Sequence, residues 1–213
     1  MLIPVNKPPG ITSHDVVNEI RGLTGVKRVG HAGTLDPFAT GVLVVGIGRE
    51  NTKELGRIAE SDKEYVAILK FGEESSTGDP EGKIARISDR KITREDLERV
   101  IPEFTGAIQQ TPPAYSAVRI RGVRAYLLAR KGKPVTPPPR HVTVSSIEIL
   151  SFEYPKAKLK IACSSGTYIR SLAEDIGRAL GVGAYLTALE RTRVGPFTIQ
   201  DAVEPSDIKT RIL

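Results

Sequence analysis

Asp36 stands out among the side chains that could do chemistry, because it lies in an unusual stretch, residues 28–41, that contains three glycines. Glycine allows backbone conformations and close approaches that larger residues forbid. Pro37 biases the preceding residue toward extended backbone, which would project the Asp36 carboxylate from the chain. Such a carboxylate suits covalent catalysis or proton abstraction. The alternative is an ordinary turn, since Asp-Pro commonly starts one.

Arg170 is the second candidate, because the sequence places it in the first turn of a helix, where the helix dipole disfavours a cation. One interpretation is an ion pair with Glu174 one helical turn later, worth about 0.2–0.5 kcal/mol. The other is that Arg170 reaches away from its helix to an anion such as a carboxylate or phosphate. Tyr168, two residues earlier, is either a core tyrosine or a ring on which a nucleobase stacks.

Three further residues have both an ordinary and a functional interpretation. His31 lies in the glycine-containing stretch and is either a packed histidine or part of a site. Tyr65 lies in a strand pattern and by default is one aromatic residue of a sheet face. Lys7 precedes Pro8-Pro9-Gly10 and by default is a solvated lysine beside a turn.

Several classes of site are not indicated by the sequence. It contains neither a phosphate-binding Gly-Lys-Ser/Thr loop nor a GxGxxG dinucleotide fingerprint. One cysteine and three histidines do not form a zinc-binding pattern at any familiar spacing. We therefore expect no metal and no cofactor.

Composition and charge favour a globular protein with a polyanionic partner. The 213 residues include 31 Lys and Arg against 25 Asp and Glu, which gives a net charge of +6. Basic residues release counterions when they neutralise phosphates, so this balance favours nucleic acid. Cys163 is the only cysteine, and no signal peptide or membrane-spanning run is recognised, so we expect a cytoplasmic protein with no membrane contact.

The first half of the chain alternates helix and strand patterns. Thr12 or Ser13 would cap a helix whose apolar face includes Val16, Val17 and Ile20. Residues 26–41 are expected to form a long structured loop, followed by a buried strand over 42–47 and another over 63–71. Residues 72–82 are predicted to form a polar turn region. Thr93 would cap a helix through Phe104, with Asp96 at the capping-box position.

The second half contains a basic excursion between two proline clusters, at 111–113 and 137–139. Prolines would stiffen both ends of this segment. Strands are predicted at 141–152 and 157–165, and Thr167 would cap a helix with apolar positions 169, 172, 173, 176 and 180. We therefore expect an α/β or α+β domain around one large sheet.

The chain resembles the TruB-type tRNA pseudouridine synthases, which form pseudouridine at position 55 in the T-loop of tRNA. The resemblance is carried by six motifs in family order that span nearly the whole chain: residues 5–15 (VNKPPGITSHD), 30–43 (GHAGTLDPFATGVL), 63–65 (KEY), 110–117 (QTPPAYSA), 165–172 (SGTYIRSL) and 183–189 (GAYLTAL). One short motif would be weak, but six in order are highly specific.

The resemblance implies a role for each candidate residue. Asp36 would be the catalytic carboxylate, Arg170 its ion-pair partner, and Tyr65 the aromatic that stacks on the base and takes part in the C5 proton step. The residues expected to bind or position the RNA are His31, Tyr168, Leu189, Lys7, Arg119, Arg121, Arg124 and Lys131. No cofactor or metal is implied.

The family fold is a mixed, mostly antiparallel sheet flanked by helices, with an insertion that grips RNA. The basic excursion at about residues 119–140 falls where this insertion belongs. Many bacterial relatives continue into a C-terminal domain of the PUA type, whereas this sequence ends at residue 213. We therefore expect a single catalytic domain over 1–213 without that domain, acting on the tRNA T-arm as a monomer with no obligatory protein partner.

Two other classes remain as alternatives. A non-catalytic RNA-binding protein on the same scaffold would keep the basic excursion but would not need Asp36, Tyr65 and Arg170 together. A guide-dependent pseudouridine synthase of the archaeal and eukaryotic type would normally carry a PUA domain and protein partners.

Overall fold

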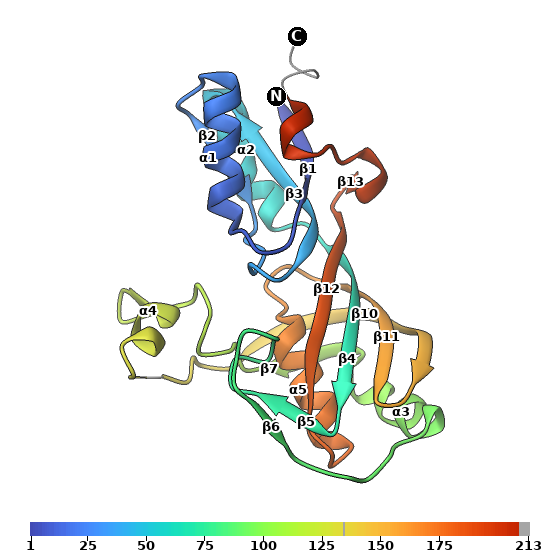
Figure 1. Cartoon of the computed structure of the whole chain (residues 1–213). Helices are drawn as coiled ribbons and strands as arrows, with labels where there is room; N and C mark the ends of the chain where they lie inside the picture. Colours follow the sequence, from blue (N-terminus) through green and yellow to red (C-terminus); the bar gives the residue numbers. More distant parts are fainter. Residues whose placement is uncertain (134, 209–213) are drawn as a thin grey trace. The chain divides into compact units, whose positions relative to one another are not determined.

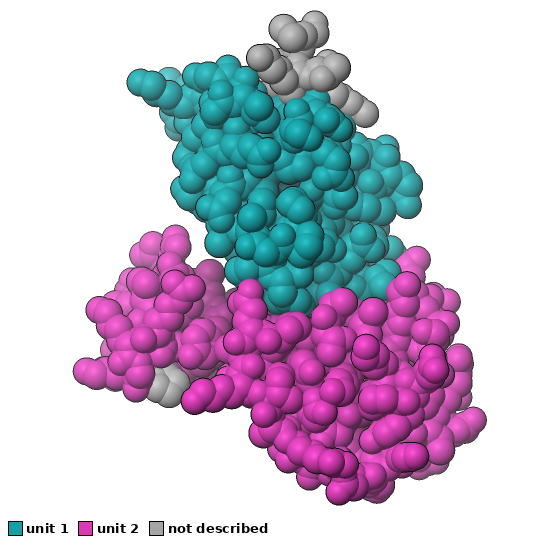
Figure 2. All heavy atoms as spheres, viewed as in Figure 1, with its two compact units in different colours: residues 1–66, 189–213 teal, residues 67–188 magenta. Residues whose placement is uncertain are grey.

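The computed structural model describes residues 1–133 and 135–208, and these residues form two compact units (Figure 2). Unit 1 comprises residues 1–66 and the chain from 189 onward, and unit 2 comprises residues 67–188. Strands β4 (Lys63–Phe71) and β12 (Ala184–Val194) each contribute residues to both units.

Unit 1 contains helices and strands from both ends of the chain (Figure 1). In addition to parts of β4 and β12, its elements are β1 (Leu2–Lys7), α1 (Ser13–Thr24), β2 (Val29–Ala32), β3 (Thr40–Ile47), α2 (Arg49–Ala59), β13 (Phe197–Thr198) and the 3₁₀ turns Ile199–Asp201 and Pro205–Asp207.

Unit 2 is continuous in the sequence (Figure 1). Its other elements are β5 (Glu73–Ser75), β6 (Ile84–Arg86), α3 (Arg94–Val100), the 3₁₀ turn Ile101–Phe104, β7 (Gly106–Gln110), β8 (Arg119–Ile120), β9 (Val123–Arg124), α4 (Ala125–Arg130), β10 (Arg140–Glu153), β11 (Lys156–Cys163) and α5 (Ile169–Ala179).

The main sheet has the strand order β1-β3-β12-β4-β11-β10-β7, with β2 also paired to β3 and β13 to β12. The pairs β1–β3, β2–β3, β7–β10 and β10–β11 are antiparallel, whereas β3–β12 is parallel. The expected mixed and mostly antiparallel sheet is therefore confirmed.

Helix α1 forms where its sequence pattern predicts it. Thr12 is the N-cap, and its side chain and that of Asp15 form a reciprocal capping box. Val16, Val17 and Ile20 are buried in one core cluster with residues of β1 and β3, because their helical spacing puts them on one face. The helix ends at Thr24 and is C-capped by Gly25, whose φ of 70° is readily adopted by glycine.

The expected loop over residues 26–41 is partly wrong, since Val29–Ala32 forms β2 and pairs with β3. Gly30 belongs to this strand rather than to a turn. A Cβ at Gly30 would lie 3.0 Å from Leu55 Cδ1 of α2, so packing against the helix explains the glycine. Only residues 33–39 remain as the connection between β2 and β3.

Two helix boundaries in unit 2 differ from expectation. Thr93 caps α3 with Asp96 in a capping box, as predicted, but the α-helix ends at Val100 and continues as a 3₁₀ turn that contains Pro102. Proline cannot donate the next helical hydrogen bond. The N-cap of α5 is Tyr168 rather than Thr167, whose hydroxyl instead donates to the Ser164 carbonyl at 3.0 Å.

Candidate active site

The loop that carries Asp36 is held by hydrogen bonds from other parts of unit 1. The Ser13 hydroxyl donates to the Leu35 carbonyl at 3.1 Å and accepts from the Leu35 amide at 2.8 Å. The Gly10 amide donates to the Pro37 carbonyl at 2.8 Å. Asp36 itself is half-buried between these two fixed residues. The neighbouring backbone therefore places the carboxylate on a rigid support.

Lys7 is fully buried, and its ammonium donates to three carbonyls, those of Pro8 at 2.8 Å, Ile11 at 2.7 Å and Pro37 at 3.1 Å. This geometry is not that of a solvated lysine beside a turn, so that interpretation is wrong. The contact with Pro37 joins the end of β1 to the residue that follows Asp36.

His31 lies on β2, two residues before the loop, and its Nδ1 is buried with no hydrogen-bond partner in the described part of the chain. Burial lowers the pKa of His31, and the nearby Arg191 guanidinium lowers it further. Both effects disfavour the imidazolium. His31 is therefore expected to be a neutral side chain near pH 7.

Tyr65 and Leu189 are the other predicted site residues of unit 1. Tyr65 lies in β4 and Leu189 in β12, and each is 7% exposed. Their low exposure agrees with packing in a core or in the wall of a site. Their contact with a nucleobase stays a prediction.

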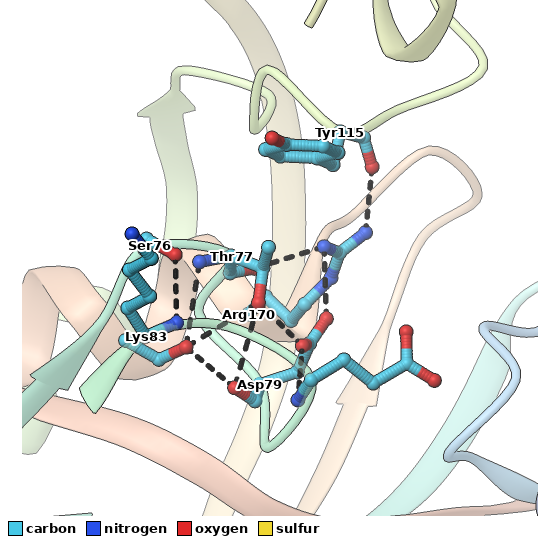
Figure 3. Close-up of polar contacts among 8 residues, drawn as sticks. Ser76, Thr77, Asp79, Lys83, Tyr115 and Arg170 are labelled. Carbon is cyan, nitrogen blue, oxygen red and sulfur yellow. Dashed lines mark hydrogen bonds and ion pairs between the residues drawn. The ribbon is translucent and has the colours of Figure 1, made fainter. Parts of the chain in front are cut away.

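Arg170 lies in the first turn of α5 and is only 4% exposed. Figure 3 shows its guanidinium directed toward Thr77, Asp79 and Tyr115. Its guanidinium forms an ion pair with Asp79, with an Nη1–Oδ2 distance of 3.2 Å. It also donates to the Thr77 and Tyr115 carbonyls, each at 2.9 Å. The interpretation in which Arg170 reaches an anion away from its helix is therefore supported, because Asp79 lies in a distant loop.

Asp79 was missed by the sequence analysis, which treated residues 72–82 only as a polar turn region. Its Oδ1 accepts from the Thr77 hydroxyl at 2.5 Å and from the Glu81 amide at 3.1 Å, which leaves Oδ2 directed at Arg170. The signal that could have found Asp79 is Thr77-Gly78-Asp79 itself, since these residue types fix a carboxylate in a turn.

Tyr168 is fixed by two residues of unit 2. The Gln110 side chain accepts from the Tyr168 amide at 2.7 Å and donates to its carbonyl at 3.0 Å. The Arg140 guanidinium lies over the Tyr168 ring, 4.7 Å from its centroid, which is a cation–π contact. These contacts also fix the start of α5, two residues before Arg170.

The predicted site residues thus fall into two groups. Asp36, Tyr65, His31, Lys7 and Leu189 belong to unit 1, and Arg170 and Tyr168 belong to unit 2 together with the basic excursion. The ion pair between Asp36 and Arg170 stays a prediction.

The basic excursion forms a small substructure in unit 2 (Figure 1). Strands β8 and β9 make a hairpin whose turn is Arg121-Gly122, both with positive φ, and α4 follows. In the described part of the chain, its four predicted RNA-binding residues are exposed and form no ion pairs: Arg119, Arg121, Arg124 and Lys131. Their charges therefore remain available to a polyanion.

Within residues 1–133 and 135–208, no three His, Cys, Asp or Glu side chains come together as a metal site would require. None of the helices described there has the length and apolar character needed to cross a membrane.

The fold is that of a pseudouridylate synthase. The chain is similar to the crystal structure of a Cbf5-Nop10-Gar1 complex, with a TM-score of 0.78 and 32% identity over 98% of this chain and 53% of that one. A crystal structure of pseudouridylate synthase at 16% identity, with a TM-score of 0.50, covers all of this chain and 73% of its own and shows the fold alone. The chain thus spans about half the length of the matched chain in the Cbf5-Nop10-Gar1 complex.

The chain belongs to the TruB family of pseudouridylate synthases. Residues 21–169 match the family described as TruB family pseudouridylate synthase (N terminal domain), and residues 170–213 match the tRNA pseudouridylate synthase B C-terminal domain. A protein named tRNA pseudouridine synthase B from Streptomyces coelicolor is 47% identical over 94% of this chain and 70% of its own length. The protein of that name from Corynebacterium diphtheriae is 48% identical over 95% of this chain and 70% of its own.

Proposed function

We propose that this protein isomerises uridine to pseudouridine at position 55, in the T-loop of tRNA. The observation that carries the proposal is the match along nearly the whole chain to relatives named tRNA pseudouridine synthase B, at 47% identity in one case. The geometry agrees with this activity, because Asp36 lies in a loop that Lys7 and Ser13 hold in place.

The reaction breaks the N1–C1′ bond, turns the uracil and joins C5 to C1′. The C5 proton is lost and N1 gains one, so substrate and product are isomers and no electron carrier is consumed. In this proposal Asp36 acts covalently at the ribose or the base, or removes a proton from the sugar. Tyr65 stacks on the flipped base and takes part in the C5 proton step.

As the ion-pair partner of Asp36, Arg170 would keep the Asp36 carboxylate ionised in a site without water. Removing water from a carboxylate favours its neutral form, and a nearby guanidinium opposes that effect. The ion pair with Asp79 and the two carbonyl contacts hold Arg170 in one orientation, which supports a role in presenting its charge to Asp36. His31 would help to hold the T-loop in its flipped arrangement, and Tyr168 and Leu189 would wall the pocket.

The basic excursion would supply phosphate contacts to the T-arm through Arg119, Arg121, Arg124 and Lys131. Single-stranded loops with accessible bases are the usual targets of sequence-specific RNA recognition, which suits a T-loop. We propose that the protein acts as a monomer in the cytoplasm, without an obligatory protein partner. The alternative is a guide-dependent enzyme with protein partners, and the similarity to a chain of a Cbf5-Nop10-Gar1 complex is the observation in its favour. The higher identity to relatives named tRNA pseudouridine synthase B favours the first proposal.

Tritium release tests the proposed activity. The purified protein is incubated with an unmodified tRNA transcript carrying uridine labelled with tritium at C5, without guide RNA or other proteins. We expect stoichiometric release, and mapping should place the product at position 55. Asp36→Asn should bind tRNA with similar affinity but release no tritium. Binding without release by the wild-type protein would favour the RNA-binding alternative, and release only with a guide RNA would favour the guide-dependent one.

A further inference from the structure

Arg191 is a fully buried arginine near the Asp36 loop to which the sequence analysis assigned no role. It lies in β12 within unit 1 and is 1% exposed. Its Nε donates to the Val42 carbonyl at 2.8 Å, and its Nη2 donates to the Gly33 carbonyl at 2.9 Å. Within the described residues of the chain, its side chain forms hydrogen bonds to these backbone carbonyls and no ion pair.

The two carbonyls lie on either side of Asp36 in the sequence. Gly33 is the first residue after β2, and Val42 is the third residue of β3. One planar guanidinium therefore joins the start of the loop to the strand that follows it. A lysine ammonium is a point donor on a flexible stem and could not reproduce this fork.

The backbone of β12 approaches this same segment closely. Arg191 pairs with Gly41 in the parallel ladder between β12 and β3. Gly41 has a φ of 96°, and a Cβ there would collide with the main chain of Arg191. The start of β3, directly after the loop, thus fits against both the backbone and the side chain of Arg191.

Arg191 also acts electrostatically on β2. The pKa of His31 is lowered first by burial, then by the Arg191 guanidinium and then by His14 of α1, while a backbone hydrogen bond involving Gly33 opposes these effects. The charge of Arg191 therefore lowers the pKa of His31, a side chain on β2, the strand that precedes the loop.

A buried cation without an anionic partner is costly, by several kcal/mol for the ion before compensation. Neutral hydrogen-bond donors could satisfy the Gly33 and Val42 carbonyls without the free-energy cost of burying a charge, so the arginine at this position calls for a further explanation. We propose that Arg191 is a positioning residue for the isomerisation, which holds the loop between Gly33 and Val42 in the geometry that presents Asp36 to the substrate. This inference rests on the proposed function, in which Asp36 is the catalytic carboxylate.

The test compares Arg191→Lys and Arg191→Met with the same substitutions at Arg193. Arg193 is two residues further along β12, is half-buried and donates to the Gly195 carbonyl at 3.3 Å, so it is a matched control outside the loop. For each folded variant, single-turnover pseudouridine formation is measured at saturating tRNA, together with tRNA affinity. Amide hydrogen exchange of residues 33–42 and the NMR titration of His31 are measured without RNA.

Both Arg191 variants should lose about a hundredfold in single-turnover rate, because a small misplacement of a catalytic group has an effect of this size, while tRNA affinity stays near the wild-type value. Amide exchange should accelerate in residues 33–42. Arg191→Met should also raise the pKa of His31, whereas Arg191→Lys, which keeps the charge, should raise it less. The Arg193 variants should match the wild type in every measurement.

A single-turnover rate within about threefold of wild type for both folded Arg191 variants would overturn the inference. So would a loss confined to tRNA affinity. Should neither variant fold, the wild-type protein still gives a test: the Arg191 Nε–H should be a slowly exchanging signal in ¹⁵N NMR, and rapid exchange would contradict its hydrogen bond to Val42. A wild-type protein that forms no pseudouridine would reject the proposed function, whereas unchanged loop exchange in Arg191→Met would reject the positioning role.

Discussion

At the scale of the residue, the pairing of Arg170 with Asp79 is the contact with the clearest physical consequence. Both side chains are 4% exposed, so neither charge is well solvated without the other. The Asp79 carboxylate accepts hydrogen bonds from Thr77 and Glu81, and these fix both its position and its orientation toward Arg170. The ion pair therefore orients the guanidinium, and its loss should affect both stability and catalysis.

Asp79→Asn should lower the free energy of unfolding by about 3 kcal/mol, because it removes a buried carboxylate that pairs with the buried Arg170 guanidinium. The single-turnover rate should fall more than tRNA affinity does, since Arg170 would lose its fixed orientation. Asp89→Asn is the control, because the Asp89–Arg86 pair is highly exposed and should contribute about 0.5 kcal/mol or less. Chemical denaturation of the two variants measures the difference, and equal effects would contradict the proposed role of burial.

Glu174 should make stability depend on pH. Burial is the largest cause that raises its pKa, from 4.5 to about 6. Between these values the folded protein keeps a proton that the unfolded chain releases, so this contribution to stability is present below pH 4.5 and is lost as the pH rises through 6.

Glu174→Gln mimics the protonated form and should therefore gain stability relative to wild type as the pH rises. The gain between pH 4.5 and 7 should be about 1 kcal/mol, after allowance for the partial exposure of the side chain. Denaturation curves at several pH values measure it. Glu103→Gln, at an exposed position, is measured alongside as the comparison variant. A stability difference for Glu174→Gln that does not change with pH would contradict the expected burial effect.

At the scale of the element, the helix α1 supports the Asp36 loop, because its first residue, Ser13, forms hydrogen bonds with the backbone of Leu35. Its capping box joins Thr12 and Asp15 by hydrogen bonds in both directions. Thr12→Ala should destabilise the protein by about 1 kcal/mol, because the amide of Asp15 loses its acceptor. Thermal or chemical denaturation measures the change. Thr136→Ala, at an exposed position outside any helix or strand, should have no comparable effect.

The basic excursion is the second element whose role can be measured separately. Replacing Arg121, Arg124 and Lys131 with Gln should weaken tRNA binding and flatten its salt dependence, because each phosphate contact on a duplex contributes a slope of about −0.9 in log affinity against log salt. A salt series of tRNA affinities measures this slope. The same charge is removed from α2 in the control variant Arg49→Gln, Lys53→Gln, Arg57→Gln. Equal slopes for the two triple variants would show that the excursion has no special role.

At the scale of the whole molecule, the proposed reaction needs only groups that the chain itself supplies. The change from uridine to pseudouridine is redox-neutral, and the candidate acid, base and positioning groups are Asp36, Tyr65 and Arg170. Exhaustive treatment with EDTA should therefore leave the single-turnover rate unchanged, provided that monovalent salt keeps the tRNA folded. Restoration of a lost rate by catalytic amounts of zinc or magnesium, with the RNA fold verified, would require a different mechanism.

The sequence determined the chemistry-bearing motifs, the family and much of the local structure. The helix start at Thr12 or Ser13, the capping box at Thr93 and the apolar face of α5 were predictable, because caps and helical periodicity depend on residues within one or two turns of each other. The strand β2 was not predicted, since its glycine is explained by packing against α2 rather than by local backbone preference.

Only the tertiary structure decided which residues support the candidate catalytic groups. Asp79 and Arg170 are 91 residues apart in the sequence, and Gly33 and Arg191 are 158 apart. Partners at such separations are selected by the order of strands in the sheet and by the paths of the loops between them. A single sequence gives the types of these side chains but not the carbonyl or carboxylate to which each one binds. A buried polar group needs a hydrogen-bond partner, and folding determines which partners lie within reach.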